Sequence, residues 1–259
     1  MTSTGESLVE RNPNSRVMFR SLFEADLIAL KGNRRSLILS IVLPLIILLT
    51  TSTHKAQQSL GGTLLIIGLA ITYGLMSTSM LGYALNVARD RDKGVFQRLR
   101  VTPAPTWMIM TSRLGVQVIA NLIISLVVVI IGASIHHLTL TPGQYALVIA
   151  ISIIGGAVFL SIGQALVGLL RSPDTVNAAG RAVFISLALL GIVGLNGTLG
   201  SAVETASRWS PTGTIMTLFS GVLNLARWSS TDSLSLLACM IYILVFAGIG
   251  IRWFSWAAE

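Results

Sequence analysis

Residues 87–105, with the sequence VARDRDKGVFQRLRVTPAP, form a polar, cation-rich island between two long apolar segments. Residues 60–86 before the island and residues 114–135 after it contain no Lys, Arg, Asp or Glu. Because charged side chains are costly in the hydrocarbon of a bilayer, we expect the island to be a loop at a membrane surface. Its excess of cations predicts the cytoplasmic surface.

The composition of the whole chain also indicates a membrane protein. Of its 259 residues, 53% are hydrophobic and 11% are charged, whereas about 25% of the residues of a soluble domain are charged. The net charge of +8 would suit a nucleic-acid-binding protein, but the cations lie beside apolar segments, where they meet lipid headgroups. We therefore expect membrane lipids, and no nucleic acid, as partners. The first apolar run begins only after 35 polar residues, so we expect no cleaved signal peptide.

Six segments are long and apolar enough to cross a bilayer as helices, or nearly so, since a crossing takes about 20 residues. They lie at 36–53, 60–86, 106–135, 143–170, 177–198 and 233–252. The semi-polar stretch 199–232, which contains several Gly residues and one Pro, predicts a re-entrant or interfacial helical hairpin before the last span. The predicted fold class is an all-α membrane protein with six transmembrane helices. It comprises a cytoplasmic N-terminus (1–35) and one transmembrane domain (36–259).

The cations orient this bundle. With the N-terminus inside, fifteen of the eighteen Lys and Arg residues lie on the cytoplasmic side, and only Lys55, Arg208 and Arg227 lie outside. Cytoplasmic loops of membrane proteins carry such an excess of Lys and Arg. We therefore expect a multi-pass protein of a bacterial-type plasma membrane with both termini in the cytoplasm.

Two short segments on the cytoplasmic side have an apolar face. The spacing predicts an amphipathic helix over 16–31 that lies along the inner leaflet and leads into the first span. In the island, a short helix that begins at Gly94 and ends before Pro103 would have one apolar stripe. Such a helix can lie on headgroups, but it is too short to bind lipid strongly, and we favour insertion into a groove of a cytoplasmic partner. The stripe consists of Val95, Phe96, Leu99 and Thr102.

Residues for chemistry within the chain are scarce. The three lysines follow Leu, His and Asp, so the Gly-Lys step of a phosphate-binding P-loop is absent. The spans hold no acidic residue, which disfavours a proton relay. His54, His136 and His137 have no Cys or carboxylate beside them, and we expect no metal site. We therefore expect no enzyme activity and no cofactor bound by this chain, and another chain must supply any energy.

Polar residues in and near the spans are candidates for contact with a transported molecule. Each amide can equally form a hydrogen bond between helices, which is the interpretation we favour. In the hairpin, Glu204 and Arg208 lie one helical turn apart and form either a weak surface pair or an outer gate. The candidate amides are Asn86, Gln117, Asn121, Gln164, Asn177 and Asn196.

This arrangement resembles the permease subunit of the type-2 ATP-binding-cassette (ABC) exporters, in the group of the daunorubicin-resistance-like drug permeases. The resemblance covers essentially the whole chain and is most specific in Arg89-Asp90-Arg91-Asp92-Lys93-Gly94, followed by Leu99 and Thr102-Pro103. In the family this region is the coupling element (89–103 here) that meets a separate ATPase. The family often has a Glu early in this motif, where this chain has Ala88, Asp90 and Asp92. The turn Arg171-Ser172-Pro173-Asp174 resembles the family's short loop between the fourth and fifth spans.

The resemblance implies a permease that exports a small amphipathic drug, lipid or lipopeptide. A cytoplasmic ABC ATPase subunit would hold ATP and Mg, and a second permease copy or paralogue would complete a dimer. Two stripes of small residues, 70–82 and 157–165, can pack within one subunit as easily as between two. A polysaccharide or glycoconjugate exporter is the alternative within the superfamily, and a secondary carrier or a membrane scaffold is the alternative outside it. The implied ATPase-coupling residues are Arg89, Asp90, Arg91, Asp92, Lys93, Gly94, Val95, Phe96, Arg98, Leu99 and Pro103.

Overall fold

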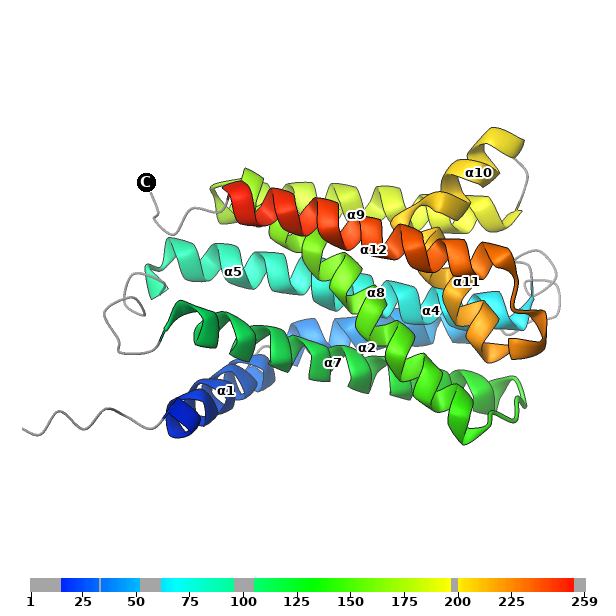
Figure 1. The fold of residues 1–259 in the computed structure, drawn as a ribbon, viewed down its shortest axis with the longest axis horizontal. Coiled ribbons are helices and arrows are strands. Elements are labelled where there is room, and N and C mark those ends of the chain that lie inside the picture. Colours follow the sequence, from blue (N-terminus) through cyan, green and yellow to red (C-terminus); the bar gives the residue numbers. More distant parts are fainter. Residues whose placement is uncertain (1–14, 33, 52–61, 96–104, 197–199, 254–259) are drawn as a thin grey trace, which may run out of the picture.

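The structure is a computed structural model that describes residues 15–32, 34–51, 62–95, 105–196 and 200–253. Over these residues the chain is helical and has no strand. Figure 1 shows long helices running side by side, with the first helix inclined at one end of the bundle. In chain order the elements are α1 (Ser15–Gly32), α2 (Arg34–Thr50), α4 (Thr63–Leu75), η1 (Met76–Gly82), α5 (Tyr83–Asp92), α7 (Thr106–Ile135), α8 (Pro142–Leu169), α9 (Pro173–Asn196), α10 (Ser201–Trp209), α11 (Pro211–Leu223), η2 (Leu225–Arg227) and α12 (Ser230–Trp253).

Five helical stretches are long and apolar enough to cross a membrane, and they correspond to the second to sixth predicted spans. The chain is therefore a multi-pass membrane protein. The first predicted span, 36–53, contains α2, which has 17 residues and Pro44 inside it. At about 1.5 Å per residue, α2 is shorter than the roughly 30 Å of hydrocarbon, so the sixth crossing stays a prediction. The five stretches are Thr63–Asp92, Thr111–Ile135, Pro142–Leu169, Pro173–Val193 and Ser230–Trp253.

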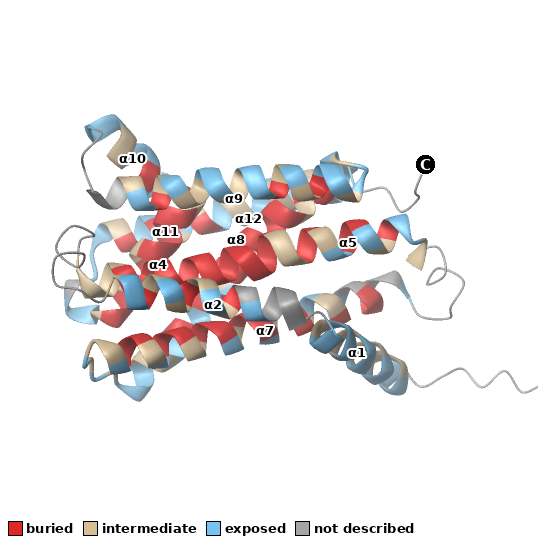
Figure 2. Cartoon of the chain, turned by 180° about the vertical axis from the view of Figure 1, so that it is seen from behind, coloured by how far each residue is buried: buried red, intermediate tan, exposed pale blue. Residues whose placement is uncertain are grey.

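The second span forms the centre of the bundle. It runs without a break through α4, η1 and α5, and Figure 2 shows its middle buried. Ile71, Leu75 and Met76 are fully buried within the chain. The helix α8 crosses the bundle obliquely beside it (Figure 1) and contacts η1 and α5. Because α4 is apolar on every side, it packs against neighbours all round, as a helix without a polar face must.

The polar island begins as helix, and the prediction of a loop from residue 87 onward is wrong for residues 87–92. The helix α5 continues to Asp92 because Val87, Ala88 and Arg91 face the interior and are buried. It ends where Gly94 adopts φ 65°, a left-handed conformation that glycine adopts at low cost after a helix. The Gly94 N–H bonds the Arg91 carbonyl at 3.0 Å. The short helix expected from Gly94 to Pro103 lies mostly outside the described residues.

Glycines let α8 approach its neighbours closely. A Cβ on Gly163 would lie 3.1 Å from the carbonyl oxygens of both Ser79 and Met80. A Cβ on Gly168 would lie 3.0 Å from the carbonyl oxygen of Gly250 in α12. Small residues at such crossings allow tight packing in membranes, where helices associate largely through van der Waals contact. The stretch η1 and the helices α8 and α12 therefore form one closely packed group.

Residues from both stripes of small residues are buried within this one chain. On the second span, a Cβ added to Gly74 would lie 2.9 Å from Ile124 of α7 and 3.1 Å from Pro44 of α2. Ala70 and Thr78 of the same stripe are buried. On α8, Ser161 is also buried. The second-span stripe therefore packs against α2 and α7.

The stretch 199–232 contains two helices, α10 and α11, joined at Ser210. The Ser210 hydroxyl accepts the Gly213 N–H at 3.1 Å and so caps α11. A Cβ on Gly213 would lie 2.0 Å from the Ser207 carbonyl oxygen, so the tight corner requires glycine. The helix α11 is largely buried and contacts α4, α8, α9 and α12. Figure 1 shows α10 projecting from the bundle at the end opposite α1. Two helices are present as predicted, while their depth in a membrane remains a prediction.

Candidate functional site

One end of the bundle collects the chain segments around the island, and we call it the basic end. Here α5 ends, α7 begins, α8 turns into α9, and α1 lies against the bundle (Figure 1). Residues 96–104, between α5 and α7, are not described. Phe96, Arg98, Leu99 and Pro103 of the predicted coupling set therefore lie outside the described residues. The remaining members of the set lie at residues 89–95.

An ion pair joins the two sides of the 93–105 segment. Arg113 Nη2 of α7 lies 2.8 Å from Asp90 Oδ2 of α5, and both side chains are largely shielded from solvent. Asp90 was predicted as a coupling residue, whereas Arg113 was counted among the cytoplasmic cations but not chosen. Its signal in the sequence is a single cation close to the start of an otherwise uncharged span. The pair therefore connects α5 directly to α7.

The amphipathic helix expected over 16–31 is present as α1 and docks on α7. The Ser112 hydroxyl donates a hydrogen bond to Asp26 Oδ2. A Cβ added to Gly115 would lie 3.1 Å from the Phe23 ring, so glycine makes room for that aromatic side chain. Burial raises the pKa of Asp26, and the Ser112 hydrogen bond and the nearby Arg113 charge oppose this rise. A polar cluster therefore connects α1, α7 and α5.

Arg91 does not present its charge to the solvent. Its side chain is 4% exposed, and its guanidinium donates to the carbonyl oxygens of Val167 at 2.9 Å and of Leu170 and Arg171 at 2.6 Å. These carbonyls belong to the end of α8 and the following turn, where helix carbonyls lack intrahelical partners. A cation there also suits the negative end of the helix dipole. Arg91 thus fastens the end of α5 to the α8–α9 turn.

The other described members of the predicted coupling set are more accessible. Arg89, Asp92 and Lys93 are exposed, and Gly94 and Val95 are half-buried. This set alternates between side chains that face the bundle and side chains that face outward. The exposed members are the ones available to another protein.

The α8–α9 turn is held by its own capping contacts. The Thr175 N–H bonds Ser172 Oγ at 3.1 Å, and Pro173 occupies the first helical position, where its missing N–H costs nothing. Because Arg91 bonds the two carbonyls just before this turn, the turn and the end of α5 form one connected surface at the basic end.

The amides proposed for a substrate path lie mainly in helix contacts. Asn121 Nδ2 donates to Ser79 Oγ at 2.7 Å, and Thr78 Oγ1 donates to Asn121 Oδ1 at 2.9 Å. Gln117 Nε2 is 3.4 Å from the same Asn121 oxygen. The Tyr83 hydroxyl donates to Gln164 Oε1 at 2.8 Å. The Gln117–Asn121 contact lies within α7. The other bonds connect the second span to α7 and α8, as interhelical hydrogen bonds commonly do.

The remaining amides differ from this pattern. Asn86 is exposed and Asn177 is half-buried. The side chain of Asn196 lies outside the described residues.

The polar cluster around Asn121 includes Thr78 and Ser79 of η1, a π-helical stretch of seven residues. Such irregular turns often occur at functional positions.

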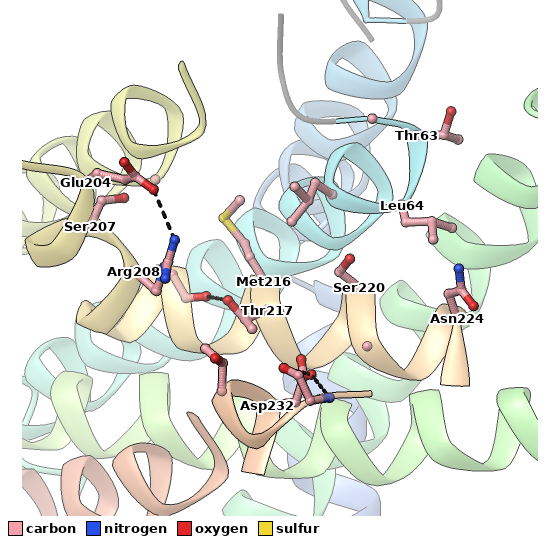
Figure 3. Close-up of a pocket in the computed structure, with 17 residues that line it drawn as sticks. Thr63, Leu64, Glu204, Ser207, Arg208, Met216, Thr217, Ser220, Asn224 and Asp232 are labelled. Atoms are coloured by element: carbon pink, nitrogen blue, oxygen red, sulfur yellow. Dashed lines mark hydrogen bonds and ion pairs between the residues drawn. The ribbon is translucent and has the colours of Figure 1, made fainter. Parts of the chain in front are cut away.

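The opposite end of the bundle, which we call the hairpin end, contains the predicted outer gate. Arg208 Nη2 lies 3.0 Å from Glu204 Oε1, and both side chains are about half exposed. Both residues line a cavity of about 680 Å³, and Figure 3 shows the side chains around it. Asp232, at the start of α12, lines the same cavity and was not chosen from the sequence. Its position directly before the last apolar run is the signal that was available.

The two described histidines also lie at the hairpin end of their helix. His136 is half-buried and His137 is exposed with φ 53°. Burial and the neighbouring His137 lower the pKa of His136. Among the described residues, no three His, Cys, Asp or Glu side chains gather where they would hold a metal ion. His54 lies outside the described residues.

The described residues form a multi-pass helical bundle with a polar network at one end and a cavity at the other, an arrangement that fits a membrane transport protein. The sequence comparison with known families agrees. Residues 18–223 match the family described as ABC-2 type transporter, and the chain belongs to this family. That family comprises the membrane component of a transporter and not its ATPase.

One curated relative is "Putative transport permease YvfS" of Bacillus subtilis (strain 168). It is 24% identical over 119 residues, which cover 46% of this chain and 48% of the relative. The matched part is therefore about half the length of each protein. No solved structure matches the chain.

Proposed function

We propose that the chain is the permease subunit of an ABC exporter, powered by a separate cytoplasmic ATPase that binds the 89–103 segment. Family membership supports a transport role. The observation that supports this docking place is the polar network at the basic end. It ties α5 and α7, which flank the 96–104 segment, to each other, to α1 and to the α8–α9 turn. A push on that segment would therefore reach all four together.

The network divides into two arms. One arm runs from the coupling segment through Arg91 to the end of α8, and then through the close Gly168–Gly250 contact to α12. The other runs through Arg113 to α7, and through Ser112 and Asp26 to α1. An ATPase that moved the segment would change the relation of these two groups of helices. Transport requires such a difference between two states, because a ligand is moved only if the states bind it differently.

The carried molecule in this proposal is a small amphipathic drug, lipid or lipopeptide. The apolar spans support this class. So do the outward faces of α9 and α12, where Ile185, Leu189 and Leu244 are exposed. These faces also leave room for membrane lipid and for a second permease copy or paralogue. Export with both termini in the cytoplasm is part of the proposal.

The decisive experiment measures coupling to a stand-alone ABC ATPase from the same genome. After co-purification and reconstitution, we expect the permease to stimulate ATP hydrolysis. Phe96→Asp or Leu99→Asp should return the rate to that of the ATPase alone, because a carboxylate in the apolar stripe opposes insertion into a groove.

Gln97→Asp is the matched control, since it adds the same carboxylate on another face of the predicted helix and should preserve stimulation. Membrane insertion of all three variants should equal that of the wild type. Unchanged stimulation in both Phe96→Asp and Leu99→Asp would exclude the proposed docking role. Transport that persists without any ATPase and collapses with an ion gradient would instead establish a secondary carrier.

A further inference from the structure

The cavity at the hairpin end, which we call the hairpin cavity, is a partly open cavity lined by parts of the chain that are far apart in sequence. The start of α4, the last part of α9, the α10–α11 hairpin and the start of α12 all contribute to its lining (Figure 3). Its volume of about 680 Å³ lies in the range of small-molecule sites, roughly 300–1,000 Å³.

The charged side chains of the lining do not balance. Glu204 and Arg208 neutralise each other as an ion pair. Asp232 is the third charged residue of the lining, and it is 5% exposed. Among the side chains that the structure describes, no cation lies within ion-pair distance of Asp232. The described lining therefore holds two carboxylates and one guanidinium.

Asp232 uses its two oxygen atoms differently. Oδ2 accepts hydrogen bonds from the Ser229 backbone N–H at 2.7 Å and from the Ser229 hydroxyl at 2.8 Å. Oδ1 lies beside Gly221, where an added Cβ would be only 2.7 Å away. Glycine at 221 thus makes room for that oxygen, which occupies the space that a side chain at 221 would need. In Figure 3, Asp232 lies below α11, and its residue is part of the cavity lining.

The remaining lining is amphipathic. Leu64, Leu65 and Met216 provide apolar surface, whereas Thr217 and Ser220 provide hydroxyl groups. Apolar surface suits a hydrocarbon or aromatic body, and hydroxyls suit a hydrated head. A buried carboxylate without a cation is costly, and a charge-assisted hydrogen bond from an ammonium group would compensate it.

We propose that the hairpin cavity binds the ammonium group of an amphipathic amine, with Asp232 as its counter-ion and the Leu64–Met216 side holding the apolar body. The proposal deepens the exporter function proposed above by naming a substrate class. Binding at this site does not require the ATPase, so its test is independent of the coupling test.

A purely structural role for Asp232 is the competing explanation, because its Ser229 bonds resemble a helix cap. Asp232→Asn separates the two roles. Asparagine retains an oxygen that accepts the Ser229 bonds, and it removes the charge. Asp174→Asn is the matched control, since Asp174 also lies in the first turn of a helix but is exposed and at the basic end.

The experiment measures binding to the full chain in uncharged maltoside micelles by equilibrium dialysis, with empty micelles as the blank. The probes are 4-phenylbutylamine and its uncharged counterpart 4-phenylbutanol. We expect the wild type to bind the amine at least tenfold more tightly than the alcohol. Asp232→Asn should weaken amine binding about tenfold to a hundredfold, the effect of losing a charge-assisted hydrogen bond, and should leave alcohol binding unchanged. Asp174→Asn should bind both probes as the wild type does.

Competition identifies the source of the amine. If lysophosphatidylethanolamine displaces the probe and lysophosphatidylglycerol does not, the site binds a lipid headgroup. If neither lipid competes, the site binds a free amine.

Equal affinities of the wild type for amine and alcohol would overturn the proposal. An Asp232→Asn variant that binds alcohol normally and amine at full strength would overturn it as well. If that variant does not fold, the wild-type comparison of the two probes still decides.

Discussion

At the scale of single residues, Arg91 links two parts of the chain at the basic end through hydrogen bonds. Its buried guanidinium donates to three carbonyl oxygens at the end of α8 and the turn after it. Hydrogen bonds to charged groups contribute more than neutral ones, and removing one partner of a buried charged contact is costly. The side chain therefore stabilises the junction that the proposed coupling segment would push against.

We predict that Arg91→Gln lowers the free energy of unfolding by about 2–5 kcal/mol. The midpoint of thermal unfolding in micelles should fall by several degrees, since about 1 kcal/mol corresponds to roughly 2–4 °C at this chain length. Arg89→Gln removes the same charge two residues earlier from an exposed side chain and should shift the midpoint by no more than about 1 °C. Equal shifts for the two variants would show that Arg91 does not hold this junction.

At the scale of elements, the approach of α8 and α12 depends on glycine at one place and not at another nearby. A Cβ on Gly250 would lie 2.6 Å from Gln164 Cγ and 2.9 Å from the Gln164 carbonyl carbon. At Gly248, on the same helix, nothing lies within 4 Å of an added Cβ. The two helices must separate to accept a side chain at 250 and need not move to accept one at 248.

We predict that Gly250→Ala lowers the thermal midpoint, because a methyl group forced between closely packed helices costs about 1–3 kcal/mol. Gly248→Ala should leave the midpoint unchanged or raise it, since alanine is the better helix former by about 1 kcal/mol. Both variants are measured by the same thermal unfolding scan in micelles. A Gly250→Ala variant as stable as the wild type would show that α8 and α12 do not meet as closely as described.

At the scale of the whole molecule, the proposed orientation places the basic end in the cytoplasm and the hairpin end outside. Single cysteines introduced at Asp92 and at Thr205, both exposed, report on the two ends. The native Cys239 is buried and is replaced by serine to give a background without thiols.

We predict that Thr205→Cys reacts with a membrane-impermeant maleimide added to intact cells, whereas Asp92→Cys reacts only after the membrane is opened. The physical reason is the excess of Lys and Arg at the basic end, which is retained on the cytoplasmic side during insertion. The measurement is the fraction of labelled protein on a gel. Labelling of Asp92→Cys in intact cells would reverse the orientation, and with it the place at which a cytoplasmic ATPase could dock.

Properties that are local along the chain were predictable. The runs 106–135 and 143–170 predict α7 and α8 because each is continuous, apolar and long enough to span the bilayer. The spacing of apolar residues in 16–31 likewise predicts α1, because it places them on one face of a helix. The charges of the island identify it in the sequence, but the expectation of a loop fails for residues 87–92. Carbonyl oxygens within the protein, rather than water, accept the hydrogen bonds of the Arg91 guanidinium.

The sequence by itself determined the membrane class, the positions of five spans, the helices at each end and the family resemblance, because hydrophobic length and charge follow directly from neighbouring residues. Only the tertiary structure decided which partners the polar groups have. It paired Asp90 with Arg113, turned Arg91 inward, placed Asn121 against Ser79, and brought Asp232 to the same cavity as Glu204. These contacts join residues on different helices, and the crossing of those helices is set by packing that no local pattern records.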